Sequence, residues 1–282
     1  MKRLLLLLPL LVSSLHAQQV AITIDDFPFR RMGLPANEEA EMVEKLYTYL
    51  DEFDIQATGF INAKRINAKN APAIKEFLSR GHTMANHTYV HSNIDQVGAE
   101  RFILDIDKGW SEGKEFINSK YFRYPYLRRG NTLERRDSVY AHLEKEGYII
   151  AHVSIDNNEW IYNRDYVKAR ERGQQKEMDS IATAYLNHMK EVSLNYEKDA
   201  ITLTGSSIKH ILLIHANPIN AFYLGELLSW YKEQGWGFIT LEEALTDPIY
   251  DMEGDFVSPY GWSIIDKVKK MIKDRASEPD GK

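Results

Sequence analysis

The chain has 282 residues, of which 44% are hydrophobic and 27% are charged, and its formal net charge is −6. This length and composition suffice for one large domain or two small ones, and they exclude a chain that is mostly disordered. The absence of cysteine excludes disulfides and leaves histidine and carboxylate side chains as the ligands for any metal.

Residues 1–17 have the pattern of a secretory signal peptide. Lys2 and Arg3 precede an apolar run from Leu4 to Val12, which is too short to remain in a bilayer as a membrane span. We therefore expect a periplasmic or secreted protein without a stable membrane span. Removing the two basic residues leaves 33 basic and 41 acidic residues, a net charge of −8, which argues against nucleic acid as a partner.

Short β-like runs alternate with amphipathic helical runs, which is typical of an α/β fold with mainly parallel strands. The periodicity predicts strands at 19–25, 55–62, 82–87, 120–124, 149–155, 210–215 and 237–240. It predicts helices at 38–53, 72–80, 133–146 and 220–234, and a glycine follows each of the last three, as is usual at helix ends.

A single domain over residues 18–250 is the simplest interpretation, because no linker and no internal repeat divides the chain. Within it, residues 157–209 are highly charged and are interpreted as a helical insertion, with a helix over 178–195. Residues 251–282 predict a last amphipathic helix followed by a frayed end.

Two adjacent carboxylates, Asp25 and Asp26, end the first predicted strand, in the sequence AITIDDFPF. An aspartate at this place can be a simple strand cap. However, apolar residues surround the pair, and charges in such surroundings need partners or a metal. Neighbouring strand residues point to opposite faces, so both carboxylates can serve one site only where the chain leaves β geometry, which Pro28 favours.

His87 and His91 form a second motif, four residues apart in the sequence GHTMANHTYVHSNI. This spacing puts both imidazoles on one side of a helix or an extended chain, so they can bind one ion. By itself the pair fits a structural role equally well. Together with Asp26 it makes a set of two imidazoles and one carboxylate that leaves coordination positions open.

Three further polar residues follow predicted strands. Arg123 lies in YFRYPYL and is either a solvated strand end or a forked partner for a carboxylate. Asp156 closes the strand before Trp160, and His215 closes the strongly apolar strand in HILLIHANP. Each has a structural explanation alone, but the carboxyl ends of parallel strands share one face, where such folds place their active sites.

The motifs T-I-D-D, H-T-x-x-H, R-x-P-Y, D-x-x-x-W and L-I-H, in this order over residues 23–215, resemble those of the polysaccharide deacetylases with NodB homology, carbohydrate esterase family 4. The resemblance implies a distorted (β/α) barrel and a divalent metal, usually zinc. It also implies removal of N-acetyl or O-acetyl groups from sugars. Cobalt, nickel or manganese could bind the same ligands.

The resemblance also implies roles for individual residues. Asp26, His87 and His91 would hold the metal, and Asp25 would be the general base that takes a proton from the water that the metal activates. His215 would protonate the leaving group, and Arg123 would orient Asp25. The remaining implied roles are the backbone N–H of Tyr126 as oxyanion donor, Asp156 as partner of Arg123 or His215, and Leu213 and Trp160 as walls of an acetyl pocket.

Two positions depart from the family pattern. Asn157 and Glu159 follow Asp156 where the family often has another spacing before the tryptophan. Ala216 follows His215 where the family often has an acidic residue.

We therefore expect a secreted metal-dependent hydrolase that removes N-acetyl groups from peptidoglycan or a chitin-like polymer. The alternatives are an O-acetyl esterase acting on xylan or an exopolysaccharide, a deacylase for a small amide, and a non-catalytic barrel that binds glycans.

Overall fold

The computed structural model describes residues 18–28 and 36–277 of the chain. The predicted signal peptide, residues 1–17, and the end of the predicted frayed tail, 278–282, lie outside these ranges. In the described ranges, no helix has the length and apolar character needed to cross a membrane.

Seven parallel strands form a single sheet in the order β5-β4-β3-β2-β1-β6, and β7 pairs with β1 beside β6. Each lies inside or overlaps a predicted strand range. The strands are β1 (Gln19–Phe27), β2 (Thr58–Ile61), β3 (Thr83–Asn86), β4 (Tyr121–Phe122), β5 (Ile149–Ile150), β6 (Lys209–His215) and β7 (Gly237–Ile239).

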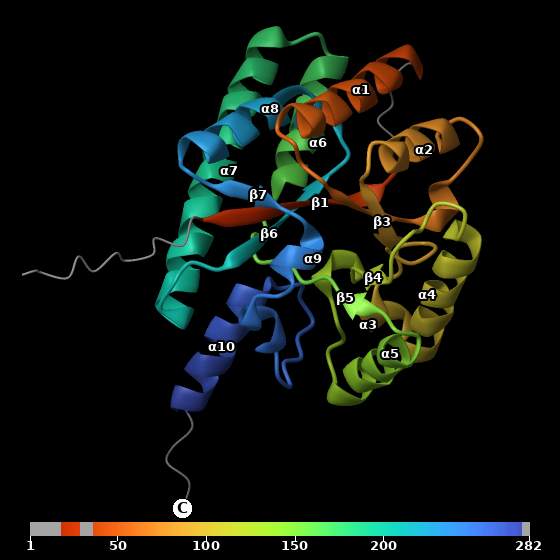
Figure 1. Ribbon diagram of the computed structural model, residues 1–282, viewed down its shortest axis with the longest axis vertical. Coiled ribbons are helices and arrows are strands. Elements are labelled where there is room, and N and C mark those ends of the chain that lie inside the picture. Colours follow the sequence, from red (N-terminus) through yellow and green to blue (C-terminus); the bar gives the residue numbers. More distant parts are fainter. Residues whose placement is uncertain (1–17, 29–35, 278–282) are drawn as a thin grey trace, which may run out of the picture.

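The sheet curls, and an irregular segment joins its two edges. After β5, Ile155 forms a bridge with Leu212 of β6, and its N–H donates to the Ile211 carbonyl at 3.0 Å. Helices surround the curled sheet (Figure 1). The predicted α/β distorted barrel is therefore confirmed.

All four predicted helices are present, with ends shifted by one or two residues, and several shorter elements complete the fold. The α-helices are α1 (Ala36–Glu52), α2 (Ala71–Ser79), α3 (Ile94–Val97), α4 (Ala99–Gly113), α5 (Leu133–Lys145), α6 (Glu159–Glu171), α7 (Gln175–Thr204), α8 (Pro218–Glu233), α9 (Leu241–Ala244) and α10 (Ile264–Ser277). The 3-10 helices are η1 (Ala63–Arg65), η2 (Pro125–Leu127) and η3 (Pro248–Asp251).

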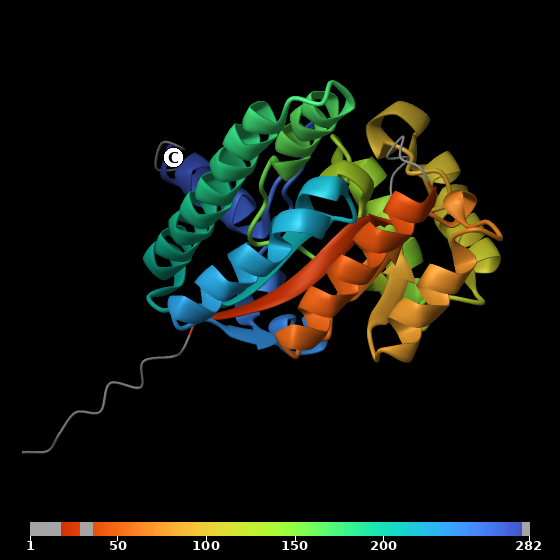
Figure 2. The same cartoon turned by 90° about the horizontal axis from the view of Figure 1, so that it is seen from above.

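The charged segment 157–209 forms α6 and α7, which pack against each other and against α8. Figure 2 shows the long α7 running beside α8, and α8 in turn packs against α1. The buried residues Tyr185, Leu186 and Met189 of α7 join the main core. The helical hairpin formed by α6 and α7, the charged hairpin, is thus anchored by an apolar face, although most of its surface is charged.

Alternation along β1 separates the core from the barrel interior. Val20, Ile22 and Ile24 face the helices and belong to the main core, whereas Ala21 packs inside the barrel. By the same period of two, Thr23 and Asp25 face the interior. β6 shows the same division: Leu212 and Ile214 join the main core, so Leu213 and His215 also point inward.

The structure predicts an unusual effect of a glycine in α4. A Cβ on Gly109 would lie 2.6 Å from Asn86 Oδ1 and 2.7 Å from the Thr88 carbonyl carbon. Alanine usually stabilises a helix relative to glycine, but here we expect Gly109→Ala to destabilise the protein by about 1–3 kcal/mol through overpacking. Thermal denaturation measures this change.

Gly237→Ala is the matched control, because its Cβ would meet no atom closer than 3.9 Å. Equal melting temperatures for wild type and Gly109→Ala would contradict the predicted close approach of α4 to the turn after β3.

Candidate active site

Asp25 and Asp26 reach one site because β1 bulges at its end. The register between β1 and β2 shifts between Ile24 and Phe27, and Asp26 has a left-handed backbone with φ 61°. An extra residue in a strand bends it and re-aims its side chains. The chain therefore leaves β geometry at the place where the two carboxylates require it, and both are 3% exposed.

His87 and His91 follow β3 in a turn that is neither helix nor strand. Thr88 and His91 have positive φ values of 65° and 62°, and the His91 N–H donates to Thr88 Oγ1 at 3.0 Å. The imidazole centroids lie 4.9 Å apart. The turn, and not the regular spacing assumed from the sequence, brings the two imidazoles together.

These two histidines and Asp26 form a candidate metal centre. One potential ligand atom from each residue lies within 4.8 Å of the others, and His91 Nε2 is 3.4 Å from Asp26 Oδ1. His87 Nδ1 lies 2.8 Å from the Arg123 carbonyl oxygen. Since a carbonyl only accepts, Nδ1 carries the proton and Nε2 has the lone pair that a metal needs.

The electrostatics of the three groups suit a cation. Burial would raise the pKa of Asp26, but His91 and His87 beside it lower that pKa to about 2. Burial lowers the pKa of His87 to about 4, and burial together with His87 lowers that of His91 to about 3. At neutral pH the centre therefore offers one carboxylate and two neutral imidazoles, which is a donor set that divalent ions bind.

Asp25 is held by Arg123, which is 1% exposed. Arg123 Nη1 donates to Asp25 Oδ1 at 3.1 Å, Nη2 donates to Thr23 Oγ1 at 3.1 Å, and Nε donates to the Ala151 carbonyl at 2.6 Å. Burial raises the pKa of Asp25, and the Arg123 guanidinium counteracts this shift. The contacts fix the carboxylate in place and favour its ionised form.

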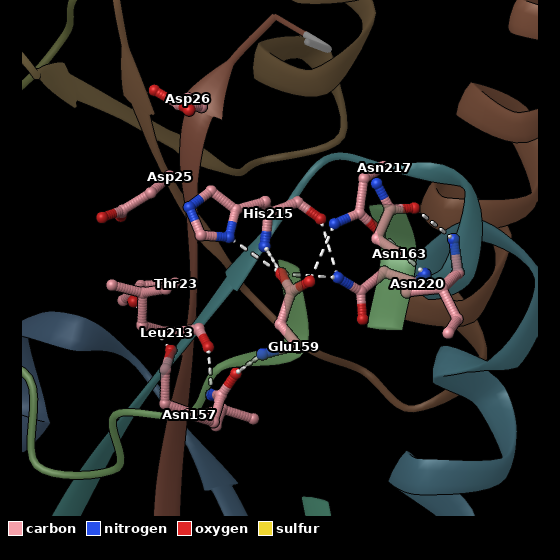
Figure 3. A network of polar contacts seen from close by, with 12 residues as sticks. Thr23, Asp25, Asp26, Asn157, Glu159, Asn163, Leu213, His215, Asn217 and Asn220 are labelled. Atoms are coloured by element: carbon pink, nitrogen blue, oxygen red, sulfur yellow. Dashed lines mark hydrogen bonds and ion pairs between the residues drawn. The ribbon is translucent and has the colours of Figure 1, made fainter. Parts of the chain in front are cut away.

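His215 lies beside Asp25, because the two residues are register partners on β6 and β1. Figure 3 shows its imidazole between Asp25 and Glu159. His215 Nδ1 is 2.8 Å from Glu159 Oε1, which also accepts the His215 backbone N–H at 2.7 Å. Burial opposes protonation of His215, but Glu159 raises its pKa to about 9.

Glu159 is completely buried and is fixed by two asparagines. Asn217 Nδ2 donates to its Oε2 at 2.9 Å and Asn220 Nδ2 to its Oε1 at 3.1 Å (Figure 3). Sequence reasoning missed this residue. The sequence shows one signal for it: Glu159 is an acidic residue three positions after Asp156 and directly before Trp160, in the motif that carries the resemblance.

Asp156 makes its hydrogen bond to the turn that follows β5 and not to either of the two partners expected for it. Its Oδ1 accepts the Asn157 backbone N–H at 2.8 Å, while Arg123 contacts Asp25 and His215 contacts Glu159. No direct hydrogen bond to Arg123 or His215 is present among the described residues, but Asp156 acts on both electrostatically: burial raises its pKa and His215 counteracts this shift, while burial lowers the pKa of Arg123 and Asp156 counteracts that. The reason for the missing hydrogen bonds is geometric: the chain turns at residues 156–158, and the first residue of α6 reaches His215 instead.

The remaining predicted residues lie in different surroundings. Leu213 is 7% exposed, next to Thr23 in register, and on the same side of β6 as His215. Trp160 is 45% exposed at the start of α6. Tyr126 lies in η2 with φ 57°, and its ring centroid is 4.4 Å from that of His91. Arg65, which was not predicted, contacts Asp26 Oδ1 at 3.6 Å.

A second cluster of catalytic residue types has no access to substrate. Ser154 Oγ lies 3.1 Å from His210 Nδ1, and His210 Nε2 lies 2.8 Å from Glu197. All three residues are at most 4% exposed. We interpret the cluster as structural.

Comparison with known proteins gives a family match for the N-terminal part of the chain. The model of the family described as polysaccharide deacetylase matches residues 13–148. Nearly half of the chain therefore matches the polysaccharide deacetylase domain. The chain is 28% identical over 149 residues to the peptidoglycan-N-acetylglucosamine deacetylase of Bacillus cereus, an alignment that covers 50% of this chain and 46% of that protein.

Solved structures share the fold. The family 4 acetyl xylan esterase of Clostridium thermocellum, in complex with a cobalt ion, matches with a TM-score of 0.54 and 18% identity over 86% of this chain and 98% of that one. A family 4 pseudoenzyme from Bacillus anthracis matches with a TM-score of 0.55 and 16% identity over 82% of this chain and 66% of that one. The same fold therefore occurs in a family 4 enzyme and in a family 4 pseudoenzyme.

Glu159→Gln tests the origin of the high pKa of His215. Without the carboxylate, we expect the imidazole of the metal-free protein to titrate at lower pH. In the wild type, the ion pair of His215 and Glu159 makes its full contribution to the stability of the fold below pH 6.5, and this contribution disappears as the pH rises through about 9. It amounts to roughly 3 kcal/mol by linkage, since one pKa unit is worth about 1.4 kcal/mol.

NMR titration of His215 and urea unfolding at several pH values measure both effects. Asp165→Asn is the control, because Asp165 is a surface carboxylate of the same helix that pairs with Arg164 and Lys168, and it should leave the His215 titration close to that of wild type. A wild-type midpoint in Glu159→Gln would mean that another group sets the pKa.

Proposed function

We propose that the protein is a secreted metal-dependent hydrolase that removes N-acetyl groups from a glycan built on N-acetylglucosamine, such as peptidoglycan or a chitin-like polymer. The observation that carries the proposal is the arrangement of a base, an acid and a ligand set on one face of the barrel. Asp25 and His215 are register partners on adjacent strands, and Asp26 of the metal centre follows Asp25 directly.

The residues at the metal centre fit a divalent ion. Asp26, His87 and His91 supply one oxygen and two nitrogen donors, and the Arg123 carbonyl fixes the tautomer of His87. Such donors suit zinc, and also cobalt, nickel or manganese. A bound ion would polarise the acetyl carbonyl group and acidify a water molecule.

Asp25 is suited to accept the proton of the attacking water. Its Oδ1 is occupied by Arg123 at 3.1 Å, and His87 Nε2 lies 3.9 Å from its Oδ2, so the carboxylate adjoins the metal centre. A general base must lie within hydrogen-bond reach of the proton that it removes. Arg123 keeps the carboxylate oriented while it does so.

His215 is suited to donate a proton to the leaving amine. Glu159 keeps Nδ1 protonated and raises the pKa of the ring to about 9, so the imidazole is cationic at neutral pH. The resemblance assigns the N–H of Tyr126 to the developing oxyanion, where one donor typically contributes 10²–10³-fold to the rate. The proton of the attacking water and the proton for the leaving amine are therefore handled by residues of two different strands, Asp25 of β1 and His215 of β6.

An O-acetyl esterase is the second candidate, because the similar Clostridium thermocellum structure is an acetyl xylan esterase. Ester and amide cleavage require the same base and metal, but an amine is the poorer leaving group and depends more on an acid. A binding barrel without activity is the third candidate, as the Bacillus anthracis pseudoenzyme illustrates. Binding alone requires neither Asp25 nor His215.

Asp25→Asn distinguishes an enzyme from a binding protein. We expect zinc-dependent acetate release from chitin oligomers or peptidoglycan to fall by about 10²–10⁴-fold, as is usual on loss of a general base. Zinc affinity, measured by calorimetry on the metal-stripped protein, should change little, because the three ligands remain. Full activity in this variant would show that Asp25 is not the base.

His215→Ala distinguishes the two hydrolases. If the leaving group is an amine, amide cleavage should fall at least tenfold more than cleavage of an activated aryl acetate, which needs no acid. Acetate release from chitin oligomers, peptidoglycan and acetylated xylan identifies the preferred class. Equal losses on amide and aryl ester would contradict the role of His215 as acid.

A further inference from the structure

We propose that residues 256–262, the aromatic strap, form a binding subsite for a neutral sugar ring of the glycan beside the metal centre, with Tyr260 stacking on the pyranose. This inference rests on the proposed function, because it names the substrate feature that the site recognises. The strap lies outside residues 13–148, the region that the family model matches, and it contains none of the motifs that carry the resemblance.

Backbone contacts fix the strap to the segment that leads from β4 to α5 and, just after the strap, to the segment that follows β5. The Ser258 N–H donates to the Gly130 carbonyl at 3.4 Å, and after the strap the Ile264 N–H donates to the Val153 carbonyl at 2.8 Å. Between them, Gly261 packs so closely on Tyr126 that a Cβ would overlap its carbonyl oxygen. The strap therefore crosses η2 at the residue whose ring contacts His91.

Ser258 also makes the strap rigid. Its hydroxyl accepts the Tyr260 backbone N–H at 3.0 Å and the Trp262 Nε1–H at 2.8 Å. The Trp262 ring packs on Phe256 at a centroid distance of 5.6 Å. Tyr260 is thus presented on an ordered turn, and a ligand that stacks on it loses little binding energy to ordering the backbone.

The two most exposed aromatic residues of the described chain meet here. Tyr260 is 66% exposed and Tyr126 is 54% exposed, and the two backbones meet through Gly261, which is one residue from Tyr260. Successive Cα atoms are about 3.8 Å apart, so Tyr260 lies next to the η2 contact. A large aromatic ring kept in water beside a reactive centre is a feature of binding sites.

The chemistry of the strap selects the ligand. Its sequence, FVSPYGW, contains no charged residue, so it offers aromatic faces and no partner for an anion. A pyranose ring has an apolar face of C–H groups that matches an aromatic ring, and its hydroxyl groups stay in water. The occupant is therefore a neutral sugar next to the acetylated one, and not an acidic sugar or a phosphate.

Kinetics with substrates of increasing length test the subsite. For chitin oligomers, Tyr260→Ala should raise KM about tenfold with little change in kcat, and the gain in kcat/KM from dimer to tetramer should disappear. Expressing each value relative to an aryl acetate, which has no second ring, removes any general effect on the site. Tyr260→Phe retains the ring and should restore most of the wild-type KM.

Tyr140→Ala is the matched control, because Tyr140 is a tyrosine of α5 that is 46% exposed and does not belong to the strap. It should behave as wild type with every substrate. A wild-type KM profile in Tyr260→Ala would overturn the subsite.

Binding measured without turnover separates this inference from the proposed function. Calorimetry of chitin tetramer with Asp25→Asn should give an affinity that Tyr260→Ala weakens about tenfold in the same background. If the wild type released no acetate but this difference persisted, the proposed hydrolase would fail and the subsite would stand. If the wild type released acetate but Tyr260→Ala left the affinity unchanged, the proposed hydrolase would stand and the subsite would be overturned.

Discussion

The burial of the Asp25 carboxylate is the constraint on which the rest of the site depends. A buried ionised carboxylate is costly unless a charge and hydrogen bonds compensate it. Arg123 provides this compensation, but it is itself buried, so Thr23 and the Ala151 carbonyl must accept its remaining N–H groups, and Phe60 lies 4.4 Å below the guanidinium. Strands β1, β2, β4 and the segment after β5 are thus tied together around a single charge.

Strained backbone is concentrated at the same place. Among the described residues, six other than glycine have positive φ, and five of them belong to the site segments: Asp26, Thr88, His91, Tyr126 and Leu127. Such conformations are unfavourable for most residues and persist only where the surrounding structure enforces them. Here the packing of α4 against the turn after β3, and the close approach of Gly261 to η2, supply that enforcement. The packing of the barrel therefore keeps Asp26, His91 and Tyr126 in these conformations.

The sequence predicted the regular parts of this arrangement better than the irregular ones. Alternation located all seven strands, and the meeting of carboxyl ends on one face predicted that Asp25, His87, Arg123 and His215 would come together. The His87 and His91 pair was predicted for the wrong reason, since two left-handed residues and not a regular period make it. Glu159 was missed because a residue on a helix end can reach a strand-end histidine only if the preceding turn has a particular shape. Helix α4 escaped detection because its glycines, which lower helix propensity, are required by close packing.

The position of Glu159 at the beginning of α6 has an evolutionary consequence. The basicity of His215 is set by a residue of the charged hairpin and not by the barrel that holds the other site residues. A change in the length or tilt of α6 and α7 would therefore alter the protonation of His215 while every strand-end motif stayed the same. Homologues that differ in this hairpin can diverge in pH optimum and leaving-group preference without any substitution among the metal ligands.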